Sequence, residues 1–296
     1  MSGYPVMEAE RALATADQLG EGPLWSPGEQ SLYWVDIYGQ RIHRLHPATS
    51  EHQVFEPVVR VTALGLRASG GLVVTTDKAF TGWDPKAQTL VPLAAPEGVA
   101  PAVRFNDGAV DHMGRFWAGT MNEEDGERPD GCLYRLDADG ELRMMGTNYT
   151  ITNGIGWSPD NTRMYLTDSA RRVIWVYDYD HTSGSISNQR PFVRVPEEEG
   201  VPDGLTVDGQ GSVWSAHWGG WRVTRYDPDG RVTFEVRLPV QNVTSCAFGG
   251  KNLDELYITT AWLTLTEGER KAQPQAGDLF RAKVGVRGIE EPSFAG

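Results

Sequence analysis

A short strand-like unit recurs six times along the 296-residue chain, and this repeat restricts the possible folds more than any other sequence feature. Each unit contains an apolar run, rich in β-branched and aromatic residues, that follows a turn signal of Gly, Pro, Ser or Asp. The six runs cover residues 32–36, 72–75, 115–118, 164–167, 212–215 and 256–259. The period of the repeat, about 42 to 50 residues, is the length of a four-stranded antiparallel unit.

A second strand-like run follows these segments and ends in a new turn. The clear cases are residues 41–45, 132–136, 173–177 and 223–226. We find no convincing amphipathic helix between the units. The pattern therefore predicts an all-β protein, a six-bladed β-propeller that forms one domain over residues 1–296. A β-sandwich is the alternative, but it does not explain six units in register. The run 6–15 is the candidate outer strand that closes the last blade.

The repeat also predicts which residues meet at the centre of the ring. Aligned on their turns, the six units place one residue each at the start of the innermost strand. These residues are Glu21, Ala63, Asp107, Asn153, Asp203 and Ser245. Equivalent positions of innermost strands surround the axis at one depth, so four of the six direct carboxylate or amide oxygens toward one point.

Several carboxylates in a small volume raise each other's pKa unless a cation neutralises them. Oxygen ligands suit Ca²⁺, Mg²⁺ or Mn²⁺ better than Zn²⁺. A Gly follows the polar residue in Glu21-Gly22, Asp107-Gly108, Asn153-Gly154 and Asp203-Gly204. Such dipeptides are also common in turns, so the prediction of a metal site depends on the agreement between repeat register and oxygen chemistry.

The composition excludes several classes of partner. With 40 Asp and Glu against 27 Lys and Arg, the net charge is −13, so we expect no nucleic-acid partner and no anionic membrane surface. The first twenty residues lack a signal-peptide pattern, and no apolar stretch is long enough to span a bilayer. Cys132 and Cys246 are too few for a disulfide framework and are expected to be buried thiols. These features predict a cytoplasmic protein. We expect it to be a monomer or a weak homo-oligomer.

Other catalytic motifs are absent from the sequence. The six histidines form no metal-binding spacing, and we expect most of them at the surface or in turns, with His217 a candidate pocket residue. There is no Gly-x-Ser-x-Gly nucleophile elbow, phosphate-binding loop or dinucleotide fingerprint. Trp218 and Trp221, in a Gly-flanked loop, are the tryptophans least expected in the core.

A series of short motifs resembles the regucalcin/gluconolactonase family over essentially the whole chain. The motifs are Glu21-Gly-Pro, Val35-Asp-Ile37, Arg104-Phe-Asn-Asp-Gly108, Gly119-Thr-Met121, Asn153-Gly154, Pro202-Asp-Gly204, Thr244-Ser-Cys246, Phe248-Gly-Gly250, Gln275-Ala-Gly-Asp278 and Ser293-Phe-Ala-Gly296. The resemblance implies a six-bladed propeller with one divalent cation, Ca²⁺, Mn²⁺, Mg²⁺ or Zn²⁺. It implies a Glu, an Asn and an Asp as metal ligands, which here are Glu21, Asn153 and Asp203.

The same resemblance implies that Arg104 and Asn106 contact the substrate, together with Glu124, or its neighbour Glu123, after the Gly-Thr-Met motif. One departure affects the expected substrate: the residues around Trp218-Gly-Gly220 differ from animal regucalcins and are closer to bacterial sugar lactonases. The preferred sugar therefore stays open.

These observations predict a metal-dependent hydrolase that opens a sugar aldonolactone to the aldonic acid. In this hypothesis, the cation stabilises the oxyanion and Asp203 is the general base. A Ca²⁺-binding regulatory protein without turnover is one alternative, although no EF-hand loop is present. An esterase or organophosphate hydrolase that uses the same metal site is the other.

Overall fold

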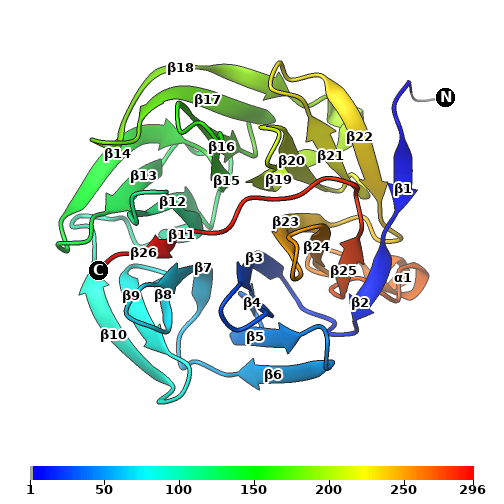
Figure 1. The fold of residues 1–296 in the computed structure, drawn as a ribbon, viewed down its shortest axis with the longest axis horizontal. Helices are drawn as coiled ribbons and strands as arrows, with labels where there is room; N and C mark the ends of the chain where they lie inside the picture. Colours follow the sequence, from blue (N-terminus) through cyan, green and yellow to red (C-terminus); the bar gives the residue numbers. More distant parts are fainter. Residues whose placement is uncertain (1–2) are drawn as a thin grey trace.

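Six antiparallel sheets surround a central axis in the computed structural model, which describes residues 3–296 (Figure 1). Each sheet contains four antiparallel strands, and two of the sheets have a fifth strand added in parallel. The innermost strand of each sheet contacts the innermost strands of both neighbouring sheets. This arrangement confirms the six-bladed β-propeller that the repeat predicts.

The blades follow the chain in order. Blade 1 consists of β3 (Gly20–Ser26), β4 (Ser31–Asp36), β5 (Arg41–His46) and β6 (Glu51–Phe55). Blade 2 consists of β7 (Val61–Arg67), β8 (Leu72–Thr76), β9 (Phe80–Asp84) and β10 (Thr89–Ala94). Blade 3 consists of β11 (Val103–Val110), β12 (Phe116–Asn122), β13 (Gly131–Leu136) and β14 (Leu142–Tyr149).

Blades 4 and 5 repeat this pattern. Blade 4 consists of β15 (Thr152–Trp157), β16 (Arg163–Asp168), β17 (Val173–Asp180) and β18 (Ser185–Arg194). Blade 5 consists of β19 (Val201–Val207), β20 (Val213–Trp218), β21 (Arg222–Tyr226) and β22 (Val232–Arg237). A 3-10 turn, η1 (Glu197–Glu199), connects them.

Blade 6 is built from both ends of the chain. It takes β23 (Val243–Gly249), β24 (Glu255–Thr260) and β25 (Leu279–Ala282) from the C-terminal part, and β2 (Glu10–Leu13) pairs antiparallel with β25. The predicted closing strand is therefore confirmed, but only in part of the run 6–15. The preceding strand β1 (Val6–Glu8) instead extends blade 5, parallel to β22.

Two short elements lie outside the predicted pattern. The helix α1 (Glu267–Ala272) lies between β24 and β25, and begins at a capping box in which Thr266 and Glu269 bond each other's backbone amides. The strand β26 (Ser293–Phe294) adds to β7 in parallel. No helix in the described part of the chain combines the length and the apolar character needed to cross a membrane.

The hydrophobic core is divided among the six interfaces between blades, one cluster in each. The second strands show why: in β4, Trp34 packs toward blade 6, whereas Tyr33 and Val35 pack toward blade 2. Because alternate residues of a strand point to opposite faces, a strand between two neighbours is apolar on both. The strand β18 is the outermost strand of its blade, and most of its residues are exposed to solvent.

Candidate metal and substrate site at the mouth of the channel

Each innermost strand contains a bulge near its start, where its pairing with the second strand shifts register. The shifts lie between Glu21 and Leu24, Val61 and Ala63, Phe105 and Gly108, Thr152 and Ile155, Pro202 and Leu205, and Val243 and Ser245. A bulge bends the strand and redirects the side chains within it. The six residues that the repeat singled out, five of them polar, therefore lie at six equivalent irregularities around one end of the channel.

Close packing around the axis explains two of the four glycines that follow the polar residues, Gly154 and Gly204. A Cβ on Gly154 would overlap the backbone amide of Leu205, and one on Gly204 would overlap the side chain of Ser245. The inner strands of blades 4, 5 and 6 approach each other too closely for a larger residue. The Asx-Gly dipeptides here mark contact between strands as well as a turn of the backbone.

Glu21, Asp107 and Asp203 form a group of mutually repelling carboxylates. Burial raises the pKa of Glu21 to about 8, and the charge of Asp107 contributes to the increase. Burial likewise raises the pKa of Asp107 to about 6 and that of Asp203 well above its usual range, with Glu21 and Asp107 adding to the latter. Backbone amides of the following glycines donate to these carboxylates, but they do not neutralise the group.

The donor set fits a hard divalent cation. Asp203 Oδ1 is buried and has no hydrogen-bond partner, an arrangement that is costly unless something positive binds there. Asn153 is oriented by its amide nitrogen, which donates to Ser169 Oγ at 3.0 Å. Glu21, Asn153 and Asp203 are each less than a tenth exposed and offer only oxygen ligands, which suit Ca²⁺, Mg²⁺ or Mn²⁺.

Arg104 and Asn106 join this group through a chain of hydrogen bonds. Arg104 Nη1 donates to Asn106 Oδ1 at 2.8 Å, and Asn106 Nδ2 donates to Asn153 Oδ1 at 3.1 Å. Both side chains are buried. The two residues that the family resemblance assigns to substrate therefore adjoin one of the proposed metal ligands.

The two glutamates after the Gly-Thr-Met motif differ in their contacts. The Glu123 carboxylate accepts from Arg104 Nε at 3.0 Å, whereas the residue Glu124 is exposed and its backbone amide donates to Asn122 Oδ1. Within residues 3–296, the Glu124 side chain makes no hydrogen bond or ion pair. Of the two candidates, Glu123 is the one that the structure connects to the buried site.

Comparisons with known proteins show the family of this chain. The family model described as SMP-30/Gluconolactonase/LRE-like region matches residues 19–262. The chain belongs to this family. Among SMP-30/gluconolactonase relatives, regucalcin from Oryctolagus cuniculus is 39% identical over 94% of this chain and 95% of its own length. Pentonolactonase XacC from Haloferax volcanii is 37% identical over 96% of this chain and 97% of its own.

A solved structure of the same family has the same fold. It is described as a calcium-binding protein, regucalcin, from Agrobacterium tumefaciens str. C58. It superimposes with a TM-score of 0.93 at 28% identity, covering 98% of this chain and 99% of its own.

Two of the six histidines depart from the expectation that most of them lie at the surface or in turns. His217 is not a pocket residue: it is fully buried, with Nδ1 2.8 Å from the Glu199 carbonyl oxygen and Nε2 3.3 Å from the Tyr226 hydroxyl. His43 is also buried, stacked on Trp34. Aromatic stacking and polar contacts, which for His217 are made by both ring nitrogens, keep these side chains inside the blades, and a search for metal spacing does not detect this.

Two other expectations about exposure hold in part. Trp221 is 41% exposed, as its loop position predicts, whereas Trp218 is half-buried against the cluster between blades 1 and 2. Cys246 is buried, but Cys132 is only half-buried, so the expectation of two buried thiols is wrong for Cys132.

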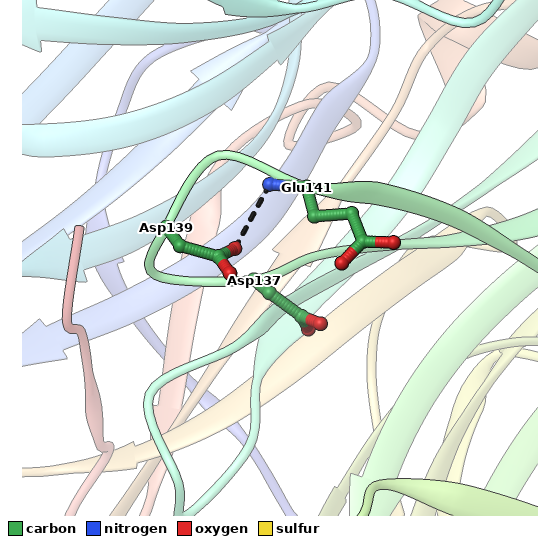
Figure 2. Close-up of side chains that lie close together, drawn as sticks. All are labelled: Asp137, Asp139 and Glu141. Atoms are coloured by element: carbon green, nitrogen blue, oxygen red, sulfur yellow. Dashed lines mark hydrogen bonds between the residues drawn. The ribbon is translucent and has the colours of Figure 1, made fainter.

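A second acidic group lies away from the channel, between the two outer strands of blade 3. Asp137, Asp139 and Glu141 occupy the turn between β13 and β14, and one ligand oxygen of each lies within 4.8 Å of the others (Figure 2). Asp137 is paired with Arg135 at 2.6 Å and with Arg143 at 3.1 Å. The Asp139 carboxylate accepts from the Glu141 amide at 3.0 Å, as in an ordinary turn. These contacts describe a solvated turn, and we assign it no metal.

Below the carboxylate group, the six inner strands enclose an axial cavity of about 90 Å³, enough for a few water molecules. Residues 289–292 line it together with all six inner strands. Figure 1 shows the C-terminal segment crossing the centre of the ring between β25 and β26. Sequence analysis did not predict this crossing segment, since it lies outside the repeat.

Proposed function

We propose that the protein is a divalent-cation-dependent hydrolase that opens a sugar aldonolactone to the aldonic acid. The observation that carries this proposal is the buried, unpartnered Asp203 Oδ1 beside two further carboxylates with raised pKa values. The relative named pentonolactonase supports a lactone as the substrate.

Glu21, Asn153 and Asp203 would hold the cation. When bound, a divalent cation supplies Lewis-acid polarisation of the lactone carbonyl and a positive charge opposite the developing oxyanion. The side chains in the hydrogen-bonded chain from Arg104 to Asn153 orient the sugar. Arg104 donates from its guanidinium, and Asn106 Oδ1 retains a lone pair for a sugar hydroxyl.

Asp203 is the proposed general base. In the reaction, the Asp203 carboxylate takes a proton from the attacking water while the water oxygen forms a bond to the lactone carbonyl carbon. The ring C–O bond then breaks, and the ring oxygen leaves as a hydroxyl because it receives the proton that Asp203 took from the water, which restores the Asp203 carboxylate. The product is a hydroxy acid, which releases one proton to neutral solution for each turnover.

A metal-replete panel of lactones tests the function. Protein stripped by a chelator is supplied with Ca²⁺, Mn²⁺, Mg²⁺ or Zn²⁺, and acid release from gluconic, xylonic, galactonic and arabinonic lactones is followed. We expect acid release that needs the cation and falls at least about 100-fold in Asp203→Asn. Turnover that continues in the chelated protein would contradict the role of the cation, and Asp203→Asn near wild-type rates would contradict the base.

A Ca²⁺-binding protein without turnover is the second candidate, because the related solved structure is described as calcium-binding. It needs the same oxygen ligands but no role for Arg104 or Asn106. Tight cation binding by calorimetry, with no acid release from any lactone of the panel, would favour this candidate over the lactonase.

A further inference from the structure

Glu123 lies at the centre of an ion-pair network that joins three blades at the mouth of the channel. Its Oε1 accepts from Arg60 Nη1 at 2.7 Å, Arg104 Nε at 3.0 Å and the Tyr38 hydroxyl at 2.8 Å. Its Oε2 accepts from Arg60 Nη2 at 3.0 Å. Tyr38 follows β4, Arg60 precedes β7 and Glu123 follows β12, so loops of blades 1, 2 and 3 meet at one carboxylate.

The network holds Glu123 in its charged form and in one orientation. Hydrogen bonds from Arg60, together with Tyr38 and the charge of Arg104, lower the pKa of Glu123 to about 2. Arg60 is itself fixed from the other side, because its Nε and Nη2 bind Asp77 at 2.9 Å. The Arg60 guanidinium also lies over the Tyr38 ring, 5.4 Å from its centroid. Such bidentate pairs favour one geometry over others.

Glu123 in turn fixes the guanidinium of Arg104. Arg104 Nε is bound to Glu123, and Nη1 is bound to the Phe105 carbonyl and to Asn106 Oδ1, each at 2.8 Å. Within residues 3–296, Arg104 Nη2 makes no hydrogen bond. One arm of a buried guanidinium is thus left to face the channel mouth, with its direction set by the two bound arms.

We propose that Glu123 is a positioning residue for substrate binding: it holds Arg104, and through Arg104 the amide of Asn106, in the orientation that receives the sugar. This proposal rests on the lactonase function proposed above. A direct contact between Glu123 and substrate is disfavoured, since four donors already occupy its two oxygens. The carboxylate is therefore committed to protein partners.

A double-mutant cycle tests this role. The variants are Glu123→Gln, Arg104→Leu and the double variant, each assayed for kcat and KM with the preferred lactone and saturating cation. Glu127→Gln, on an exposed position of the same loop, is the matched control. Cation affinity is measured for each variant by calorimetry, because a positioning residue for the substrate should leave it unchanged.

We expect Glu123→Gln alone to lower kcat/KM about 10- to 100-fold, mainly through KM, with cation affinity within about twofold of wild type. In the Arg104→Leu background, the same substitution should lower kcat/KM by less than about twofold, because the residue that it positions is gone. Equal losses in both backgrounds would overturn the proposal, since Glu123 would then act on the substrate independently of Arg104. No loss in the wild-type background would overturn it as well.

Two further measurements guard against trivial outcomes. If Glu123→Gln does not fold, the variants Arg60→Met and Arg60→Lys are assayed in its place. We expect Arg60→Met to raise KM and Arg60→Lys to raise it less. Equal KM values in wild type and both variants would overturn the proposal. The NMR signal of the Arg104 Nε–H, protected from exchange in wild type and unprotected in Glu123→Gln, reports positioning without turnover. An Nε–H equally protected in both would overturn the positioning role; a wild-type protein that opens no lactone would instead refute the proposed function.

Discussion

At the scale of single residues, the proposed site keeps like charges together at a cost to the cation-free protein. Glu21 has its pKa raised to about 8 by burial and by Asp107, so its charged form is disfavoured in the folded state. Replacing Glu21 by Gln keeps nearly the same side-chain volume and removes the electrostatic repulsion from Asp107. Function and stability are therefore expected to oppose each other at this position.

We expect Glu21→Gln to stabilise the cation-free protein by an amount on the order of 1 kcal/mol or more. The same substitution should weaken cation binding, so that added Ca²⁺ or Mn²⁺ raises the melting temperature of wild type but not of the variant. Differential scanning calorimetry with and without chelator measures both effects. A variant less stable than wild type in chelator would contradict the electrostatic argument.

His217 connects stability to pH. Burial lowers its pKa to about 4, whereas an unfolded histidine titrates near 6.5. Between these values the unfolded state binds more protons, so stability falls as the pH falls from about 6.5 to about 4. The loss amounts to about 3 kcal/mol over that window.

Urea unfolding at several pH values from 7 to 4 tests this linkage. His217→Gln should show a shallower decrease in unfolding free energy with acidification than wild type. His181→Gln, on an exposed turn, controls for the loss of a histidine as such. Parallel pH profiles for wild type and His217→Gln would contradict the assignment.

At the scale of strands and turns, a buried Asp at the end of the inner strand fixes the second strand of the same blade. Asp208 accepts from Trp214 Nε1 at 2.9 Å and Arg225 Nε at 2.8 Å, as well as from two amides of its own turn. In blade 3, Asp111 makes the same type of bond to Trp117 at 2.8 Å. The Asp-x5-Trp spacing is therefore a structural element of the blade.

Removing this carboxylate leaves donors without partners. We expect Asp208→Ala to lower the free energy of unfolding by about 3 kcal/mol, because the Trp214 and Arg225 donors lose their shared acceptor in a buried place. Asp229→Ala, which removes an exposed ion pair with Arg231 on a neighbouring turn, should change it by less than about 1 kcal/mol. Equal effects in chemical denaturation would show that the buried bond is not important.

At the scale of the whole molecule, both ends of the chain hold the ring together. The strand β2 completes blade 6, and the C-terminal segment crosses the channel and joins turns of blades 2 and 3 (Figure 1). Ala295 N donates to the Gly114 carbonyl at 3.0 Å, and Arg67 Nε donates to the Gly296 carbonyl at 2.7 Å. Phe294 is 2% exposed in the cluster between these blades.

Phe294→Ala is expected to destabilise the protein by about 3 to 4 kcal/mol, since it removes a buried ring that the crossing segment contributes to the core. Thermal unfolding measures the effect, and Phe294→Leu should restore most of the loss because it refills the volume. A melting temperature unchanged in Phe294→Ala would mean that the segment adds little to the closure of the ring.

Much of the fold follows from local sequence because blades 1 to 5 are each built from four consecutive strands. Turn signals such as Asp227-Pro-Asp-Gly230 recur with the strand pattern, so period and blade number can be counted along the chain. The helix α1 was not predicted, although Thr266 and Glu269 form the capping box that marks its start. Only six residues long, it leaves almost no hydrophobic periodicity.

The sequence by itself determined the six-fold repeat and the register that places Glu21, Asn153 and Asp203 at equivalent strand starts, because both depend on residues close together in the chain. Only the tertiary structure decided which residues from other parts of the chain contact and orient the side chains in and around the site. Glu123 meets Arg60 from 63 residues away, Asn153 is oriented by Ser169, and His217 is buried beneath Glu199. The contact between Glu123 and Arg60 joins loops of two blades, which do not repeat and which meet only when the blades pack together. The contacts of Asn153 and His217 are with residues 16 and 18 positions away, which the pairing of strands brings close.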